Sequence, residues 1–64
     1  MRYAEVSVNS PAALRRTFSY SVPPGLEIQE GQAVWVPFGE RILQGVVFSM
    51  PEIPAYEETR GIAG

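Results

Sequence analysis

Apolar and polar residues alternate over two short stretches early in the chain, and a period of two is typical of a β-strand with one face in water. In residues 2–8 the apolar face consists of Ala4, Val6 and Val8. In residues 17–22 it consists of Phe18, Tyr20 and Val22. The pattern predicts two strands. Residues 11–16 between them form either one helical turn or a loop, and we favour the loop.

Proline and glycine punctuate the segment that follows. Pro23-Pro24-Gly25 ends the second strand, because proline cannot donate to a strand ladder and Pro-Gly favours a turn. Leu26 and Ile28 are then expected to point inward. Glu30-Gly31 predicts a second turn, in which glycine supplies a positive φ.

Two further strands are predicted at residues 32–37 and 41–49, joined through Phe38-Gly39-Glu40. Both faces of the later segment are largely apolar, which indicates a central strand. Gly45 within it predicts a bulge or a bend. Residues 56–62 are expected to begin a fifth strand.

These elements predict an all-β fold: a small, partly open barrel of the OB or SH3-like kind, with four to five short antiparallel strands. We expect a single small domain over residues 1–64. Because the chain stops at Gly64 as a strand begins, we expect it to be an N-terminal fragment of a longer protein.

Composition excludes several classes of function. The 64 residues contain no cysteine and no histidine, so neither a disulfide nor an ordinary Cys/His zinc site can form. The net charge is −2, whereas nonspecific binding of long nucleic acid requires many cations to displace counterions. A signal peptide and an apolar run of membrane-spanning length are both absent, which predicts a cytoplasmic protein without membrane contact.

Catalytic chemistry is not expected from this chain. Without histidine there is no usual base for a nucleophile, six of the seven glutamates fall in predicted turns or loops, and the glycines lack nucleotide-loop spacing. We therefore predict that the chain is not an enzyme and holds no cofactor.

Four surface features remain as candidates. Arg16 precedes Phe18, Ser19 and Tyr20, a mixture that can hold a phosphate and stack a base, although core rings beside a solvated arginine are the commoner arrangement. Gly39 follows Phe38 at the hairpin tip, where it serves turn geometry alone or admits another molecule to the backbone. Trp35 is assigned to the core or to an interface, and Arg60 to solvent.

An ordered series of short motifs resembles a known family. The series consists of Arg16-Thr-Phe-Ser-Tyr20, Val22-Pro23, Gly25-Leu26, Gly31-Gln-Ala-Val-Trp-Val-Pro-Phe-Gly39 and Gly45-Val-Val47. It is similar to the N-terminal domain of the PriA replication-restart helicases, also called primosomal protein N′, over about residues 3–62. The resemblance implies a module that captures the 3′ end of the nascent leading strand at a stalled fork.

The family's pocket can be carried over position by position. The resemblance implies that Phe18 supports the terminal sugar or base, with Tyr20 and Arg16 in the same segment. The backbone of Gly39 would approach the nucleotide, and Arg60 takes the place of a lysine that would face a phosphate. Ser19 replaces an aspartate that would repel a terminal phosphate, so we expect weaker discrimination between 3′-hydroxyl and 3′-phosphate ends.

The resemblance also implies partners beyond this chain. These are DNA with a free 3′ end at branched forks, the remaining helicase domains, and other primosome or single-strand-binding proteins. ATP and zinc are implied only for the remaining helicase domains. The alternative is an SH3-like module for protein–protein contact, in which Trp35 would suit a peptide groove.

Overall fold

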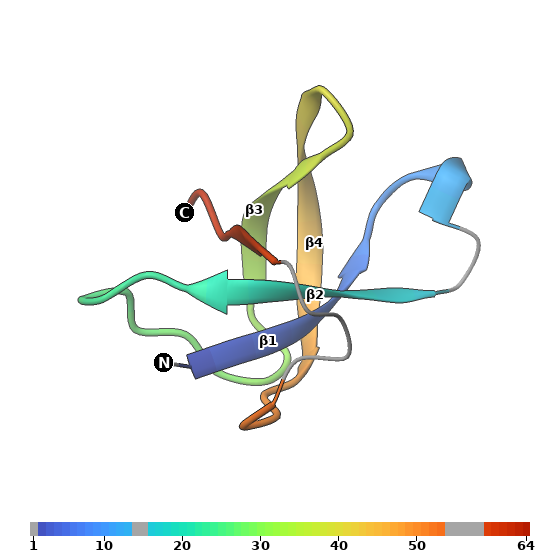
Figure 1. Ribbon diagram of the computed structural model, residues 1–64. Helices are drawn as coiled ribbons and strands as arrows, with labels where there is room; N and C mark the ends of the chain where they lie inside the picture. The colour runs from blue at the N-terminus through green and yellow to red at the C-terminus, as the bar shows by residue number, and fades with distance from the viewer. Residues whose placement is uncertain (1, 14–15, 54–58) are drawn as a thin grey trace.

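The computed structural model describes residues 2–13, 16–53 and 59–64, which form one curled sheet (Figure 1). Its strands are β1 (Arg2–Val8), β2 (Thr17–Val22), β3 (Ala33–Phe38), β4 (Arg41–Ser49) and β5 (Arg60–Gly61). Their order in the sheet is β3-β4-β1-β2-β5. The predicted all-β, partly open barrel is confirmed.

The last residues bring the two edges of the sheet together. The amide of Ile62 donates to the carbonyl of Ser21 in β2, and Ala63 donates to the carbonyl of Trp35 in β3 over 2.7 Å. In return, Trp35 donates to the carbonyl of Gly64 over 2.7 Å. These bonds join the β3 edge to the segment that follows β5, and the sheet therefore curls into a small barrel.

One pair departs from the expected antiparallel arrangement, because β5 lies parallel to β2. Tight turns connect antiparallel neighbours, whereas parallel strands need a longer crossover. The connection from β2 to β5 is long because it includes the whole β3–β4 hairpin. The predicted fifth strand is present only as Arg60–Gly61, and residues 54–58 of the prediction lie outside the described part.

The loop predicted at residues 11–16 is wrong for residues 11–13. Pro11–Ala13 form the 3-10 turn η1, and residues 14–15 lie outside the described part. The turn forms because Ser10 accepts hydrogen bonds from two of its three residues. Its carbonyl accepts from the amide of Ala13 over 3.0 Å, and its hydroxyl accepts from the amide of Ala12 over 3.2 Å.

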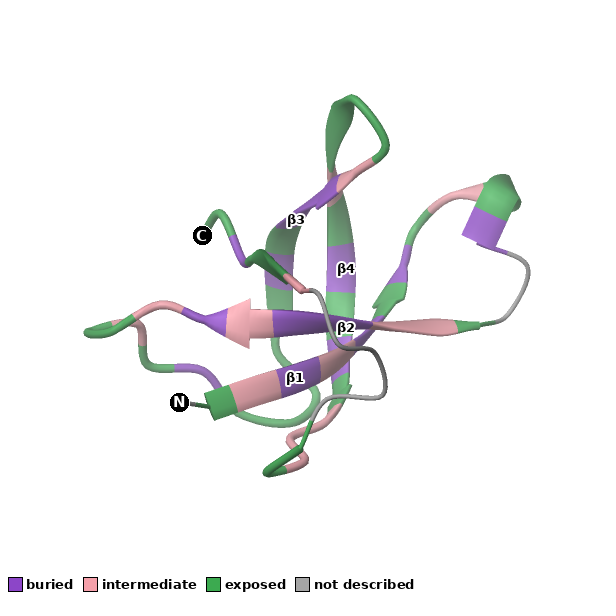
Figure 2. Ribbon diagram, in the orientation of Figure 1, coloured by how far each residue is buried: buried purple, intermediate pink, exposed green. Residues whose placement is uncertain are grey.

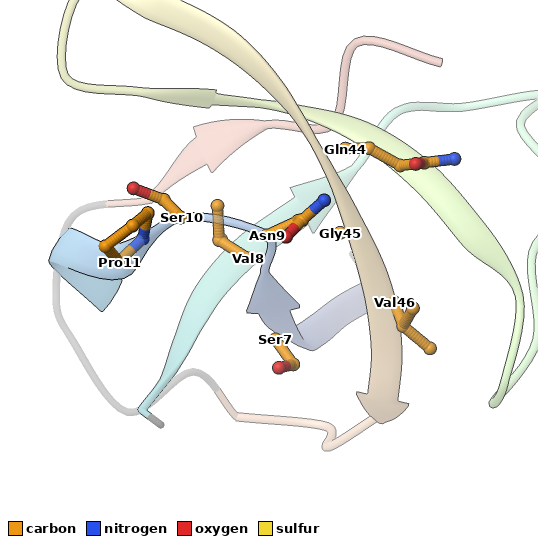
Figure 3. Close-up of a pocket in the computed structure, with 8 residues that line it drawn as sticks. All are labelled: Ser7, Val8, Asn9, Ser10, Pro11, Gln44, Gly45 and Val46. Carbon is orange, nitrogen blue, oxygen red and sulfur yellow. The ribbon is translucent and has the colours of Figure 1, made fainter. Parts of the chain in front are cut away.

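Strand β4 is central, as predicted, since it pairs with both β3 and β1. Its outer face is nevertheless exposed (Figure 2). The bulge predicted at Gly45 is wrong, whereas the alternative of a bend stays a prediction. Gly45 packs closely against β1 (Figure 3): a Cβ placed there would lie 2.5 Å from Val6 Cγ1 and 3.0 Å from the Ser7 carbonyl oxygen. The register of this pair shifts elsewhere, between Glu5 and Val6.

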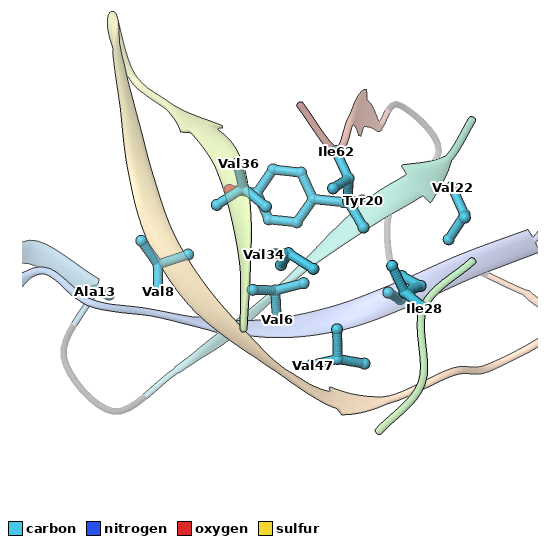
Figure 4. Close-up of a cluster of buried hydrophobic side chains, with 11 residues drawn as sticks. Val6, Val8, Ala13, Tyr20, Val22, Ile28, Val34, Val36, Val47 and Ile62 are labelled. Carbon is cyan, nitrogen blue, oxygen red and sulfur yellow. The ribbon is translucent and has the colours of Figure 1, made fainter. Parts of the chain in front are cut away.

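The core fills the concave side of the sheet with side chains from every strand except β5 (Figure 4). Tyr20 is the one aromatic residue among the fully buried members, and its hydroxyl donates to the carbonyl of Pro37 over 2.8 Å. Burial raises the pKa of Tyr20 above the ordinary value of 10.0, and the nearby positive charge of Arg60 offsets part of that shift. Buried members are Ala4, Val6, Val8, Ala13, Tyr20, Val22, Ile28, Val34, Val36, Val47 and Ile62.

Glycines with positive φ form the turns. Gly25 and Gly31 have φ values of 85° and 87° and occupy the two turns predicted between β2 and β3. At the hairpin tip Phe38 pairs with Arg41, so Phe38 ends β3 and the connection contains only Gly39 and Glu40. Gly39 has a φ of 63°, as tight two-residue hairpins require.

Candidate functional site

Two phenylalanines meet at one end of the barrel. Phe18 lies in β2 and Phe38 at the end of β3, and their ring centroids are 5.1 Å apart in an edge-to-face arrangement at 75°. The guanidinium of Arg16 lies over the Phe18 ring, 5.7 Å from its centroid. Both rings are half-buried and Arg16 is exposed, so part of this aromatic surface faces solvent under a positive charge.

A second arginine reaches the hairpin tip from β5. Arg60 pairs with Tyr20 in the register of β2 and β5, and its Nη1 donates to the carbonyl of Gly39 over 2.8 Å. The hydroxyl of Tyr20 donates to the carbonyl of Pro37, two residues before Gly39, and so holds the start of the same turn. Strands β2 and β5 therefore hold the turn of the β3–β4 hairpin in one position.

The side of Gly39 that lacks a Cβ is open. A Cβ built at this position would have no other heavy atom within 4 Å, although Arg60 occupies the carbonyl. We call Arg16, Phe18, Tyr20, Gly39 and Arg60 the tip cluster. It combines a half-exposed ring, two guanidinium groups and accessible backbone, and this combination can receive a planar ligand that carries phosphate.

Ser19 does not belong to this cluster. Successive side chains of a strand point to opposite faces, so Ser19 lies across β2 from Phe18 and Tyr20. It is only 7% exposed, and its hydroxyl donates to the carboxylate of Glu5. Thr17 donates to the same carboxylate over 3.1 Å.

All five residues of the tip cluster were named as candidates from the sequence. Glu5, which accepts a hydrogen bond from Ser19, was not. The carboxylate reaches Ser19 because β1 and β2 pair with Glu5 directly opposite Ser19. The available signal was the alternation itself, which places Glu5 and Ser19 on the outer faces of two consecutive strands. The register that aligns them is not visible in the sequence.

Two further features concern the part of the chain that the structure describes: clusters of metal ligands and helices of membrane-spanning length. Over residues 2–13, 16–53 and 59–64, no three acidic side chains are close enough together to hold a metal ion. Within the same residues, no helix has the length and hydrophobicity to cross a bilayer.

The fold and the tip cluster define a small β-barrel binding module. Residues 5–63 match the family of the PriA 3′ DNA-binding domain, described as the 3′DNA-binding domain or 3′BD. The chain therefore belongs to the PriA 3′ DNA-binding domain family, and it is a DNA-binding module. The resemblance seen in the motifs is confirmed.

A curated relative agrees with this assignment. The replication restart protein PriA of Synechocystis sp. (strain ATCC 27184 / PCC 6803 / Kazusa) is 50% identical over 30 residues. The matched stretch covers 47% of this chain and 4% of the relative. The chain thus corresponds to a small part of that much longer protein.

Proposed function

We propose that this module captures the 3′-terminal nucleotide of a DNA strand and thereby directs a replication restart helicase to stalled forks. The observation that carries the proposal is the tip cluster: Phe18 of β2 contacts Phe38, the neighbour of Gly39, and Arg60 of β5 donates to the Gly39 carbonyl, while the Cβ side of Gly39 stays open. The family match supports DNA as the ligand.

Three members of the tip cluster contact the nucleotide in this proposal. The half-exposed ring of Phe18 supports the terminal sugar or base, since every base has a π-face that stacks on an aromatic ring. Gly39 lets the nucleotide approach the backbone, because no Cβ blocks its open side. Arg60 is held at the turn by its bond to the Gly39 carbonyl and supplies a charge for a phosphate.

Recognition of a terminus agrees with the net charge of −2. A long basic surface is unnecessary when a compact site reads one nucleotide and neutralises about one or two phosphates. We expect the logarithm of the binding constant to fall with the logarithm of salt concentration with a slope of only about −1 to −2. A slope several times steeper would indicate a continuous backbone-binding surface instead.

The chemistry at the end of the strand is a separate question. Replacement of the family's aspartate by Ser19 predicts only a weak preference for a 3′-hydroxyl over a 3′-phosphate. Because Ser19 lies outside the tip cluster, this prediction rests on the resemblance and not on the geometry of the site. Glu5 shares its carboxylate between Thr17 and Ser19, on the face of β2 opposite Phe18. Comparing two oligonucleotides that differ only in the terminal group tests the prediction, and a strong hydroxyl preference contradicts it.

A charge-matched pair of variants tests the proposal itself. Arg60→Gln removes the cation at the tip. Arg2→Gln is the control, because Arg2 lies at the start of β1 and, like Arg60, donates to a backbone carbonyl, that of Leu26. The ligand is a fluorescent single strand with a free 3′ end. We expect Arg60→Gln to weaken binding about tenfold, as loss of a charge-assisted contact does.

The control variant is expected to bind as the unmodified chain does. Equal losses for Arg60→Gln and Arg2→Gln would show that net charge alone governs binding, which would overturn the proposal.

Other parts of a PriA-type protein would act on the DNA end that this module binds. We propose that an ATP-dependent helicase portion outside these 64 residues unwinds the fork, and that any ATP and zinc sites belong to that portion. The same proposal names primosome and single-strand-binding proteins as partners. Walker-type and cysteine-rich motifs in the longer reading frame would support this arrangement.

A further inference from the structure

Arg41 lies at the β3–β4 turn but does not belong to the tip cluster. It begins β4 and is directly opposite Phe38, with only Gly39 and Glu40 between them. Residues that face each other across an antiparallel pair have their side chains on the same side of the sheet, with Cβ atoms about 4.5–5.5 Å apart. Arg41 therefore projects on the side of Phe38, whose ring contacts Phe18.

The remainder of β4 supports this orientation. Side chains alternate along a strand, so Arg41 shares a face with Leu43 and Val47. Leu43 packs against the core and Val47 is buried in it, whereas Ile42 on the other face is 55% exposed. Arg41 is thus the first position of the core-facing side of β4, and its side chain is exposed because it lies at the end of the strand.

The guanidinium of Arg41 is available to a ligand. Within the part of the chain that the structure describes, no residue forms a hydrogen bond or an ion pair with it. By contrast, Arg60 donates to the Gly39 carbonyl and Arg16 lies over the Phe18 ring. The five N–H donors of a guanidinium form a planar fork that matches the oxygens of a phosphate.

Charge is divided between the two ends of the barrel, although the whole chain is acidic. Strand β4 runs from the turn at the top of the view to the loop at the bottom (Figure 1). The described charged residues near the turn are three arginines and one glutamate: Arg16, Arg41, Arg60 and Glu40. Those at the other end are three glutamates and one arginine: Glu27, Glu30, Glu52 and Arg2. A DNA strand is therefore attracted to the turn and repelled from the opposite end.

We propose that Arg41 binds a backbone phosphate of the captured DNA strand, at the second linkage from the 3′ end. Arg60 faces the phosphate of the terminal nucleotide from one side of the turn, and Arg41 faces the next phosphate from the other side. The inference rests on the proposed function and adds a second phosphate contact to the same site. Two contacts agree with the expected salt slope, since each phosphate of a single strand contributes about −0.7.

Single strands with one uncharged methylphosphonate linkage locate the phosphate that Arg41 binds. The ligand is a fluorescent 8-nucleotide strand with a free 3′ end, neutral either at the second linkage from that end or, as a control, at the fifth. We expect neutralisation of the second linkage to weaken binding about fivefold, as loss of an exposed charge-assisted contact does. Neutralisation of the fifth linkage is expected to leave binding unchanged.

Variants of Arg41 test the same contact from the side of the protein. Arg41→Gln should lose about fivefold with the unmodified strand, lose nothing more with the strand that is neutral at the second linkage, and have a salt slope shallower by about 0.7. Arg41→Lys keeps the charge without the planar fork, so we expect it to restore the slope but only part of the affinity. Thermal unfolding verifies that both variants fold.

Arg2→Gln is the charge-matched control, because Arg2 lies at the opposite end of the barrel. We expect it to distinguish the two modified strands as the unmodified chain does.

The outcomes separate this inference from the proposed function. If Arg41→Gln binds every strand as the unmodified chain does, or loses the same factor whether or not the second linkage is charged, Arg41 does not bind that phosphate and the inference is overturned. The proposed function still stands in that case if a blocked 3′ end binds more weakly than a free one. Equal binding of free and blocked ends would overturn end capture, whatever the effect of Arg41→Gln.

Discussion

Gly39 and Gly45 lie on the same hairpin, six positions apart, and have opposite surroundings. Gly45 is packed so closely against β1 that an added Cβ would lie 2.5 Å from Val6 Cγ1. Gly39 has open space at the same position but a φ of 63°. Glycine at position 45 thus serves close strand packing, whereas at position 39 it serves turn geometry and leaves one side of the backbone accessible.

The packed strands at Gly45 support the accessible turn at Gly39. Gly45 is buried where β1 pairs with β4, and the neighbouring atoms of Val6 and Ser7 pack closely around it. The tip at Gly39 is held to that interior by Tyr20 and Arg60 but is otherwise open. Substitutions at the two positions should therefore separate stability from ligand access.

The largest effect is expected from Gly45→Ala. The new methyl group would collide with Val6 and with the Ser7 carbonyl, so the strands must move apart. Overpacking of this kind costs about 1–3 kcal/mol, and we expect the upper end because one of the neighbours is backbone. Denaturant unfolding measures the loss, and an unchanged midpoint would contradict the close approach of β1 and β4.

Tyr20→Phe should come second. It removes the hydrogen bond to Pro37 and leaves that buried carbonyl without its partner, at a cost of about 1–3 kcal/mol. The pH dependence sharpens the test. Burial raises the pKa of Tyr20, so the neutral phenol's contribution is complete below pH 10.0 and is lost as pH rises through the raised value.

We therefore expect the unfolding free energy to fall above about pH 10, and to fall less steeply in the Tyr20→Phe variant. Circular dichroism at a series of alkaline pH values provides the measurement. The same alkaline slope in both proteins would show that Tyr20 does not titrate in this range.

Gly39 allows strain and access to be separated with two substitutions. Gly39→Ala places a Cβ on a left-handed backbone, at a cost of roughly 1–2 kcal/mol. Gly39→Asn adds a larger side chain, yet asparagine tolerates this conformation, so we expect a smaller loss of stability. Both should weaken binding of a free 3′ end, because each side chain projects into the open space at the tip.

If the Asn variant binds as the unmodified chain does, that space is not where the nucleotide lies. Denaturant unfolding and titration with a fluorescent single strand provide the two measurements.

Phe18→Leu is expected to have the smallest effect on stability. Phe18 is half-buried, and an edge-to-face pair such as Phe18–Phe38 is worth about 0.5–1.5 kcal/mol beyond the area it buries. DNA binding should fall more than stability does, since leucine offers no ring to the terminal nucleotide. A variant that loses stability but binds normally would assign Phe18 to packing alone.

Much of the fold was predictable from alternation and turn chemistry. Strands β1, β2 and β4 have the predicted bounds, and the turns at Gly25 and Gly31 lie where glycine was expected. The parallel pairing of β5 was not predictable, because it depends on a crossover whose path the sequence does not specify. The bulge predicted at Gly45 is wrong, because a lone glycine in a strand does not indicate how closely the neighbouring strand packs against it.

The residues of the candidate site stay a prediction, and their arrangement could not be predicted from the sequence. The resemblance implied roles for Phe18, Gly39 and Arg60, which lie far apart in the sequence; the structure shows Phe18 against Phe38 and Arg60 bonded to Gly39. The sequence does not indicate that Arg60 donates to the Gly39 carbonyl or that Ser19 faces Glu5. Both contacts follow from strand register, which depends on the packing of the whole sheet.

The central claim is that the tip cluster reads a DNA terminus. The most direct test is a competition titration of the 64-residue chain between a linear single strand with a free 3′ end and a covalently closed circle of the same sequence. We predict that the linear strand competes at least tenfold better and that Gly39→Asn abolishes the difference. Equal competition by the circle would contradict the claim, because a closed strand has no terminus to occupy the open side of Gly39.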